Sequence, residues 1–424
     1  MSKRSLSRRS FLAATSLVAA PVIVPQSVFG DDTKAAPSER ITVGHIGVGN
    51  EGGTLFRAMQ QVKEAQSVAV SDCYKSRRDG HANACKGKAY LDYHEIIDRS
   101  DIDCVVIATP DHWHVPQAIG AAKAKKGAYV EKPLGLSLAQ ILQIEKVFTD
   151  NGVQFQYGTQ QRSQEHCWRG AALVRQGVIG KIVKIEVDAP NGHGGGATAA
   201  APIPPDLGER GYETWNGPTL LRPYTVDRCK PDGTYMIYDY SIGYLGGWGA
   251  HPLDIMVWGS DADLSGTVSV EGTGTIKADE LCNTVFNWNM KIKLGEVDLV
   301  FKTGGDRTRF IGEGGDWIEV RRSGIKASKP ELLQVPVTEN NGSALAKDTG
   351  GWGGAVHYNH HRDFILGVKN KTTPVSTLRD AVRSDTISHL SDIAVRTASV
   401  VKWNPQERTL IEATDGQKAI FYRR

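Results

Sequence analysis

The sequence predicts an α/β protein of two domains: a doubly wound parallel sheet, then an α/β domain with an open, mainly antiparallel sheet. Its 424 residues are too many for one compact core. From residue 41 to residue 131, short apolar segments alternate with helical ones, which indicates parallel strands joined by helices. After residue 165, closely spaced strand-like runs separated by turns are typical of antiparallel pairing. We therefore expect domains at 31–164 and 165–424.

Short strands alternate with helices in the expected first domain. Cys73 and Cys104 are expected in central strands, where a thiol behaves as a small apolar group. None of the six cysteines forms a Cys-x-x-Cys pair, so metal-ligand spacing is absent, and we expect few or no disulfides. Strands are predicted at 41–46, 67–71, 104–108 and 128–131, and helices at 54–61, 91–99 and 115–126.

The expected second domain has a different pattern. Residues 190–235 are rich in Gly, Pro and Ala and are predicted to form a long irregular loop, of the kind that often walls or covers a site. Strands are predicted at 181–189, 266–272, 284–290, 296–302 and 317–321, and helices at 357–368 and 377–402.

A glycine motif joins the first predicted strand to the first predicted helix. Gly47-Val48-Gly49-Asn50-Glu51-Gly52 is a G-x-G-x-x-G sequence in the strand–turn–helix context that dinucleotide binding requires. Gly47 permits the tight turn, Gly49 lets the backbone approach a pyrophosphate, and Gly52 allows close helix–strand packing. The N–H groups at the helix start then face the phosphates. We therefore predict a Rossmann domain, with residues 47–52 binding the cofactor.

Asp72 follows the second predicted strand, twenty residues beyond Gly52. A carboxylate at this place can accept both hydroxyls of a ribose, which favours NAD. The neighbouring Lys75, Arg77 and Arg78 could instead bind a 2′-phosphate, so NADP stays possible. The alternative is a glycine-rich turn with an incidental Asp.

The loop 109–114 follows the predicted strand 104–108, at the sheet edge where ligands bind. We expect Thr109 and Pro110 to contact the cofactor and Trp113 to contact the substrate. His114 packs against the cofactor or, alternatively, caps the following helix.

Glu131-Lys132-Pro133 follows the next predicted strand. Lys132 could reach both the nicotinamide ribose and a substrate hydroxyl, with Glu131 beside the cofactor. Burial and a positive ring nearby would lower the pKa of Lys132, which suits a proton relay. The alternative is a Glu–Lys pair on the surface.

The first 30 residues are typical of an export signal. Arg8 and Arg9 precede an apolar run that ends at Val24, a twin-arginine pattern too short for a comfortable membrane span. A general secretory signal or a basic tail are the alternatives. We expect cleavage near Gly30 and a periplasmic or extracytoplasmic protein, exported folded with its cofactor bound and without a stable membrane anchor afterwards.

Charge argues against a nucleic-acid partner. The formal net charge is +3, and four basic residues with no acid lie within the first 30 residues. The remaining chain is therefore close to neutral and lacks the basic footprint of a nucleic-acid-binding domain.

The motifs GVGNEG, Asp72, ATPDHWH, YVEKP, YGTQQRS and GWGAHPLD together resemble the Gfo/Idh/MocA family of nicotinamide-dependent oxidoreductases, over nearly the whole mature chain. This resemblance implies a Rossmann domain followed by an α/β domain whose open sheet often mediates homo-oligomers. It implies a small sugar-like substrate, oxidised at a secondary hydroxyl of a sugar or cyclitol. It also implies Lys132 and His251 as catalytic residues.

One departure from the family pattern concerns Gly247. The family commonly shows Asp-x-Gly-x-His-x-x-Asp, and here Gly247 stands at the first Asp, while His251 and Asp254 match. Asp239 or Asp254 could compensate, or a His–Lys pair could suffice. Trp248 would stack on a sugar ring, and Asp254 would contact the substrate. Alternatively, His251 and Asp254 only cap a helix.

Further candidate site residues have less support in the sequence. Tyr157, Gln161 and Arg162 line the pocket, with Tyr157 on the substrate and Arg162 on the cofactor, or they pack between domains. His357, His360 and His361 cluster on one predicted helix, but the resemblance gives no reason for a metal, so we expect none.

Three functions remain open. The leading hypothesis is hydride transfer between a secondary alcohol and the nicotinamide, with His251 as general base and Lys132 polarising the oxygen. The second is a glycosidase that keeps NAD bound, oxidises the sugar transiently, eliminates the aglycone and reduces the sugar again, which suits an exported protein without free NAD. The third is a non-catalytic sugar-binding protein, which Gly247 makes conceivable.

Overall fold

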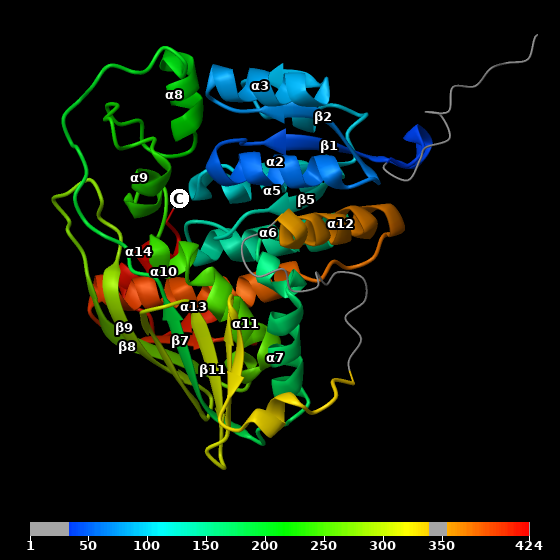
Figure 1. The fold of residues 1–424 in the computed structure, drawn as a ribbon. Coiled ribbons are helices and arrows are strands. Elements are labelled where there is room, and N and C mark those ends of the chain that lie inside the picture. The colour runs from blue at the N-terminus through cyan, green and yellow to red at the C-terminus, as the bar shows by residue number, and fades with distance from the viewer. Residues whose placement is uncertain (1–33, 339–353, 424) are drawn as a thin grey trace, which may run out of the picture.

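The computed structural model describes residues 34–338 and 354–423, and the predicted export signal lies outside them. Figure 1 shows a first sheet with helices on both of its faces and a second sheet with helices packed along it. The predicted fold class is confirmed: a parallel doubly wound sheet is followed by a mixed, mainly antiparallel one.

The first sheet has the strand order β3-β2-β1-β4-β5-β6, and its neighbouring strands pair in parallel. The order reverses between β1 and β4, and ligands bind beyond the carboxyl ends of the strands at such a reversal. The strands are β1 (Ile41–Ile46), β2 (Ala65–Ser71), β3 (Lys88–Tyr90), β4 (Cys104–Ile107), β5 (Gly127–Val130) and β6 (Phe155–Tyr157).

Two α-helices of this domain, at 75–85 and 138–151, were not predicted, and a third is shorter than expected. The helix at 75–85 was not predicted, because its residues are mostly polar and only Ala82 among them is buried. The helix expected at 91–99 shrinks to 94–97. The helices are η2 (Pro37–Glu39), α2 (Asn50–Gln61), α3 (Lys75–Cys85), α4 (His94–Ile97), α5 (Asp111–Lys123), α6 (Leu138–Asn151) and η3 (Gln160–Ser163).

The cysteines follow the prediction in part. Cys104 begins β4 and is buried, but Cys73 lies in the turn after β2 rather than in a strand. The strand ends there because the Asp72 carboxylate accepts hydrogen bonds from the N–H groups of Val48 and Tyr74, which turns the chain. All six cysteines lie within the described residues and are free.

The second sheet has the order β13-β12-β11-β7-β10-β9-β8-β14-β15. β7 and β10 pair in parallel, and the other neighbours in this described sheet pair antiparallel. The strands are β7 (Ile182–Ala189), β8 (Val268–Thr275), β9 (Phe286–Leu294), β10 (Val297–Thr303), β11 (Arg307–Gly312), β12 (Trp317–Arg321), β13 (Gly324–Ala327), β14 (Val401–Asn404) and β15 (Thr409–Ile411).

Two expectations about this domain are corrected. Helices α8 and α9 interrupt the segment 190–235, which was expected to be irregular throughout. The helix expected at 377–402 ends at Thr397, because Ala398 adopts a left-handed conformation (φ 45°) and β14 begins at Val401. The helices are α7 (Glu165–Arg175), α8 (Gly208–Asn216), α9 (Pro231–Met236), α10 (Tyr244–Gly247), α11 (Ala250–Gly259), η4 (Ala262–Leu264), η5 (Pro330–Leu333), α12 (Gly354–Asn370), α13 (Leu378–Thr397) and α14 (Asp415–Phe421).

Helix α12 packs on the first sheet although it lies late in the chain (Figure 1). Its Phe364 and Ile365 are buried in one cluster with Val43 of β1 and Leu55 of α2. The Rossmann sheet is thus covered partly by residues that the sequence placed with the second domain.

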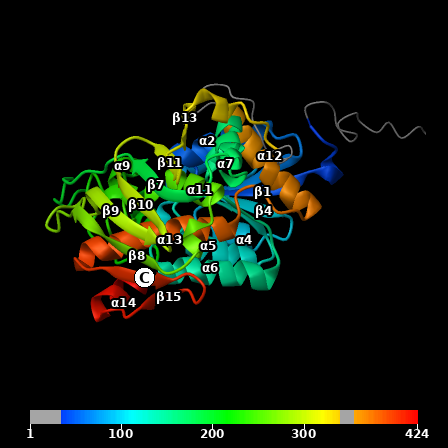
Figure 2. The ribbon, with the colours of Figure 1, turned by 90° about the horizontal axis from the view of Figure 1, so that it is seen from below.

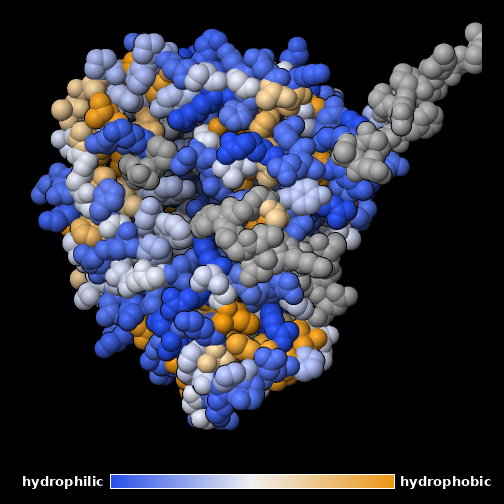
Figure 3. Space-filling model, viewed as in Figure 1, coloured by the Kyte–Doolittle hydropathy of each residue, from blue (hydrophilic) through white to orange (hydrophobic). Residues whose placement is uncertain are grey.

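Figure 2 shows α13 lying along the second sheet, with α14 and β15 at its β14 edge. The face in Figure 3 is largely hydrophilic, and its apolar residues form small groups. Among residues 34–338 and 354–423, every helix is too short or too polar to cross a membrane.

Candidate cofactor and substrate pocket

A pocket lies beyond the carboxyl ends of β1, β2 and β4, and residues from both halves of the chain line it. The Rossmann side contributes the glycine turn, Asp72, the loop after β4 and Lys132. The facing wall includes Tyr235, Tyr244, Gly247, Trp248 and His251. The structure thus brings Lys132 and His251 together, as the sequence predicts.

The glycine turn has the geometry that a dinucleotide needs. Gly47 has a φ of +81°, and a Cβ there would lie 2.7 Å from the Ala108 carbonyl oxygen. A Cβ on Gly52 would lie 2.2 Å from the Gly47 carbonyl oxygen, so the helix could not approach the turn as closely. Gly49 precedes α2, and the first N–H groups of this helix lie at the helix end beside the pocket. These backbone positions fit the pyrophosphate of a dinucleotide.

Asp72 lines the pocket and is 8% exposed. Its Oδ2 accepts a hydrogen bond from Val48 N at 2.9 Å, and its Oδ1 accepts one from Tyr74 N at 2.8 Å. Burial raises the pKa of this carboxyl, although both N–H groups favour its charged form. Asp72 therefore holds the glycine turn against the end of β2, and each oxygen keeps a second lone pair for a ligand.

The three basic residues after Asp72 have different environments. Lys75 binds Asp79 at the surface, and Arg78 donates to the carbonyl oxygens of residues 72 and 73. Arg77 lines the pocket, with its guanidinium 4.0 Å from the centre of the Tyr74 ring. A Cβ on Gly49 would lie 3.1 Å from Arg77 Nη1, so this cation lies beside the phosphate-binding turn.

The loop after β4 lines the pocket through Thr109, Pro110 and Trp113. His114 has a different role from the two that the sequence suggests. Its Nδ1 lies 2.7 Å from the Pro133 carbonyl oxygen and its Nε2 lies 2.7 Å from the Thr109 carbonyl oxygen. Burial lowers the pKa of His114 to about 4. This histidine therefore ties the loop after β4 to the loop after β5, inside helix α5 rather than at its cap.

Glu131 and Lys132 are not a surface pair. Glu131 is 5% exposed; Tyr129 Oη donates to its Oε1 at 3.1 Å, and Lys132 N donates to its Oε2 at 3.2 Å. Burial raises the pKa of Glu131 to about 8, against the opposite effect of the Lys132 ammonium. Glu131 therefore supports the backbone of Lys132, and it is Lys132 that lines the pocket.

The expected lowering of the Lys132 pKa is wrong for this structure. Burial does lower it, but nearby Tyr235, Glu131, Glu51 and Asp111 outweigh burial and raise the pKa above its ordinary value. Of these neighbours the sequence shows only Glu131, which directly precedes Lys132, and the other three come from different elements. Lys132 is therefore an ammonium at neutral pH, and it can donate hydrogen bonds to a substrate oxygen.

His251 lies in the first turn of α11 and is 1% exposed. Burial, followed by the charges of Arg322 and Lys132, lowers its pKa well below the ordinary value. The imidazole is therefore neutral at neutral pH, which is the form that accepts a proton. Trp248, also lining the pocket, has the Arg322 guanidinium 4.7 Å from its ring centre.

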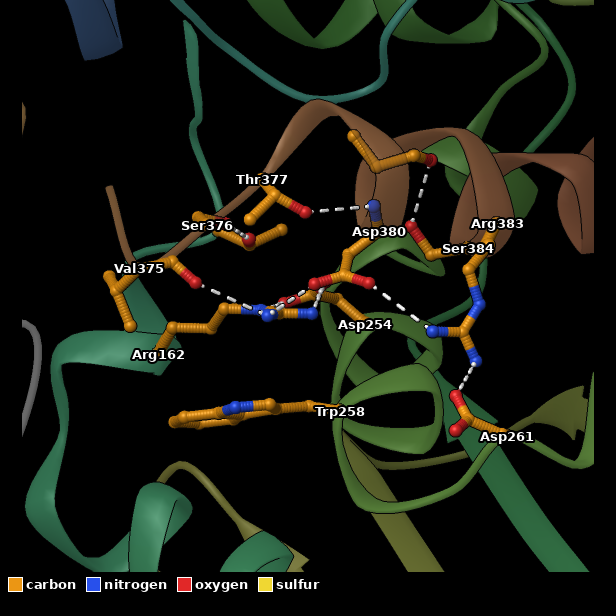
Figure 4. A network of polar contacts seen from close by, with 12 residues as sticks. Arg162, Asp254, Trp258, Asp261, Val375, Ser376, Thr377, Asp380, Arg383 and Ser384 are labelled. Atoms are coloured by element: carbon orange, nitrogen blue, oxygen red, sulfur yellow. Dashed lines mark hydrogen bonds and ion pairs between the residues drawn. The ribbon is translucent and has the colours of Figure 1, made fainter. Parts of the chain in front are cut away.

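Arg162 and Asp254 lie in a buried network of their own (Figure 4). Asp254 accepts two hydrogen bonds of 2.7 Å from Arg162, which also binds Asp380 at 2.9 Å and lies 5.1 Å from the Trp258 ring. The structure thus does not bring Arg162 to the cofactor, or Asp254 to the substrate. Because both Asp254 oxygens face Arg162, this carboxylate cannot stand in for the missing Asp at 247.

Several other predicted residues are structural. Tyr157 Oη donates to Asp385 at 2.7 and 2.9 Å, and Gln161 donates to Asp306, which agrees with the interdomain-packing alternative. Asp239 pairs with Arg222 instead of lining the pocket.

The histidine cluster on α12 is buried: His360 bonds Ser163 Oγ and the Tyr157 carbonyl oxygen. Within the described residues, there is no group of three or more His, Cys, Asp or Glu side chains that could hold a metal.

Comparison with known proteins finds a family match for the first domain. Residues 41–159 match Gfo/Idh/MocA, described as "Oxidoreductase family, NAD-binding Rossmann fold". The match covers the glycine turn, Asp72, the loop after β4 and Lys132, which are the residues that form the Rossmann side of the pocket.

Curated relatives carry several different names. The chain is 31% identical over 143 residues to "2,7-anhydro-N-acetylneuraminate hydratase" of Escherichia coli (strain K12), covering 34% of this chain and 38% of that protein. It is 30% identical over 193 residues to "Glycosyl hydrolase family 109 protein 1" of Shewanella sp. (strain MR-4), covering 40% of this chain and 39% of that protein. The matches thus span about two fifths of these relatives.

Likeness to solved structures extends further along the chain. A scyllo-inositol dehydrogenase from Lactobacillus casei, solved with NAD(H) and scyllo-inositol, superposes with a TM-score of 0.59 at 16% identity, over 86% of this chain and 99% of that one. At this identity the likeness shows a shared fold, including the second domain that the family match does not reach.

Asp111 and Tyr235 are among the pocket residues that the sequence analysis did not predict as site residues. Asp111 is buried at the start of α5, where Ser241 Oγ donates to its Oδ2 at 2.6 Å, and burial raises its pKa to about 7. Its place in the loop after β4 was a usable signal. Tyr235 lies on α9, within a segment predicted to be irregular, so the sequence held no signal for it.

Proposed function

We propose that this protein is a nicotinamide-dependent oxidoreductase that acts on a secondary hydroxyl of a sugar or cyclitol. The observation that carries the proposal is the pairing of Lys132 and His251 in one pocket, beside a turn shaped for a dinucleotide. Lys132 is a cation at neutral pH and His251 is a neutral base, and alcohol oxidation needs one group in each of these states.

The pocket residues have different roles in the proposed reaction. When bound, the nicotinamide ring supplies a hydride acceptor for the carbon that bears the hydroxyl. His251 takes the hydroxyl proton as general base, and the Lys132 ammonium donates a hydrogen bond to the same oxygen as negative charge develops on it. Trp113 and Trp248 line the pocket and offer aromatic faces for the apolar side of a sugar ring.

The identity of the cofactor and the location of the protein are also part of this proposal. Asp72 favours NAD, and Arg77 leaves NADP possible. The paired Arg8 and Arg9 support export of the folded protein to the periplasm, with a resident rather than an exchanging cofactor. The open second sheet is the surface through which we expect a homo-oligomer to form.

A second candidate function is an NAD-dependent glycosidase that oxidises, eliminates and reduces in one cycle. The similarity to a protein named as a glycosyl hydrolase favours it. A resident cofactor that is regenerated in each cycle would suit an exported protein.

The test begins with protein purified without added nucleotide, from which the released cofactor is identified by its absorption spectrum and mass. The protein is then incubated with free sugars, cyclitols and aryl glycosides. Formation of NADH or a coupled reduction supports the dehydrogenase, and glycoside cleavage without net NADH supports the glycosidase. Absence of both, with no cofactor in the purified protein, would indicate a non-catalytic sugar-binding protein.

The variant Lys132→Met ties the activity to the pocket. We expect it to lose turnover while retaining cofactor, whereas Lys123→Met, on the exposed face of α5, behaves as wild type. Retained turnover in Lys132→Met would overturn the catalytic assignment of this lysine.

A further inference from the structure

We propose that Tyr235 is a further catalytic residue of this pocket. Its phenol donates a hydrogen bond to the reacting oxygen, from the space that the side chain at position 247 would otherwise occupy. This inference rests on the proposed function and adds a third polar group to Lys132 and His251.

The position of the Tyr235 ring follows from what Gly247 lacks. A Cβ on Gly247 would lie 3.3 Å from Tyr235 Cδ1 and 3.5 Å from Cε1. A side chain at 247 would therefore press against the Tyr235 ring, which would have to shift to admit it. In this chain Gly247 leaves the ring in place.

Tyr235 also faces the reacting groups. It lines the same pocket as His251, and the Lys132 Nζ lies 5.4 Å from the centre of its ring. The charges of Lys132, Asp111, Glu131 and Glu51 act on its phenol. The ring thus stands between the Rossmann side of the pocket and helix α10, which carries Gly247.

The charge state of the phenol decides what it can do. The Lys132 ammonium lowers the pKa of Tyr235, but burial and the negative charges of Asp111, Glu131 and Glu51 outweigh it and raise the pKa to about 12. Tyr235 is therefore protonated at neutral pH and is a hydrogen-bond donor. An Asp at 247 would be an acceptor, so the substitution replaces an anion by a neutral donor.

This exchange explains how the pocket can work without the usual Asp. Although burial lowers the pKa of Lys132, its neighbours Tyr235, Glu131, Glu51 and Asp111 raise it, so the ammonium does not need a carboxylate at 247. Two donors, the Lys132 ammonium and the Tyr235 phenol, are then available to the oxygen from which His251 removes the proton. Donors aimed at developing negative charge lower the barrier of such a step.

The test compares Tyr235→Phe with Tyr238→Phe, a matched loss of one phenol hydroxyl from the same segment. Tyr238 donates to Asp392 outside the pocket, at 3.3 Å. With the substrate found for the wild type, we expect Tyr235→Phe to lower kcat by about 100-fold. The KM and the dissociation constant of the cofactor, measured by nicotinamide fluorescence, should change by less than about threefold, and Tyr238→Phe should match wild type.

A second comparison tests the position of the ring. Gly247→Ala should lower kcat several-fold in the wild type, because the added methyl group displaces Tyr235. It should cause no further loss in a Tyr235→Ala background, where no ring remains to be displaced.

Each outcome separates this inference from the proposed function. A wild-type protein without redox or glycoside turnover overturns the proposed function. An active wild type with a Tyr235→Phe variant of equal kcat overturns only the role of Tyr235. A Tyr235→Phe variant that loses cofactor binding would make this residue part of the cofactor site and also overturn the inference.

Discussion

Arg162 and Asp254 form a buried bidentate ion pair, with Nε–Oδ2 and Nη2–Oδ1 distances that are both 2.7 Å. The pair joins η3, which follows the last strand of the first sheet, to α11, which carries His251. Because a bidentate pair restricts distance and orientation, it positions α11, and with it His251, relative to the Rossmann domain.

Breaking this ion pair should destabilise the protein strongly. Asp254→Asn leaves the Arg162 charge buried with less compensation, and we expect the free energy of unfolding to fall by about 3–5 kcal/mol. Urea unfolding followed by fluorescence measures this change. The control Lys181→Met breaks an exposed pair with Glu296, which solvent screens, and should leave the free energy of unfolding nearly unchanged. Equal effects of the two variants would contradict a structural role for the buried pair.

Neighbouring glycines in α2 should respond differently to alanine. Gly52→Ala places a Cβ 2.2 Å from the Gly47 carbonyl oxygen, so the turn must move, and we expect cofactor affinity to fall at least about tenfold. At Gly53 the nearest atom would lie at 3.5 Å, an ordinary contact. Gly53→Ala should keep cofactor affinity and add about 0.5–1 kcal/mol of stability through helix propensity. Fluorescence titration with NADH measures the cofactor affinity of both variants. Similar affinities for the two would refute the prediction.

Cofactor preference should depend on Arg77 rather than on its basic neighbours. Since its guanidinium lies beside Gly49 in the pocket, Arg77→Ala should weaken NADP binding about tenfold or more, with a smaller effect on NAD. Lys75→Ala, which removes a surface ion pair with Asp79, is the matched control. Calorimetric titration of both nucleotides measures the ratio of affinities, and an unchanged ratio in Arg77→Ala would exclude this residue as the determinant.

Asp385 should make stability depend on pH. Burial raises its pKa to about 7, although Leu134 N and Tyr157 Oη donate to it. The folded protein therefore holds this proton more tightly than the unfolded chain does. The resulting stability is complete below the ordinary pKa of about 4 and is lost as the pH rises to 7, by about 1.4 kcal/mol per pH unit.

The variant Asp385→Asn lacks this titration. Its unfolding free energy, relative to wild type, should rise by about 2–3 kcal/mol between pH 5 and pH 8. Asp298→Asn, on the exposed face of β10, serves as the control. A constant difference between Asp385→Asn and wild type across this range would show that the carboxyl titrates normally.

Features that depend on residues close together in the sequence could be predicted from it. The glycine turn, Asp72 and Lys132 each follow a short apolar strand, and the spacing of the turn and Asp72 reflects contacts within one βαβ unit. Helix α3 escaped prediction because a polar helix on the outside of a sheet has almost no apolar stripe. Helix α12 was predicted as a helix, but its packing on β1 and α2 depends on contacts across some 300 residues.

The sequence alone determined the Rossmann fold, the dinucleotide-binding turn and the candidate pair of Lys132 and His251, because these depend on local backbone geometry and residue order. Only the tertiary structure decided that Arg162 and Asp254 bind each other, that Lys132 is held as a cation, and that Tyr235 fills the space beside Gly247. The physical reason is that ion pairing, pKa and steric contact depend on distances between side chains, which the order of residues along the chain does not give.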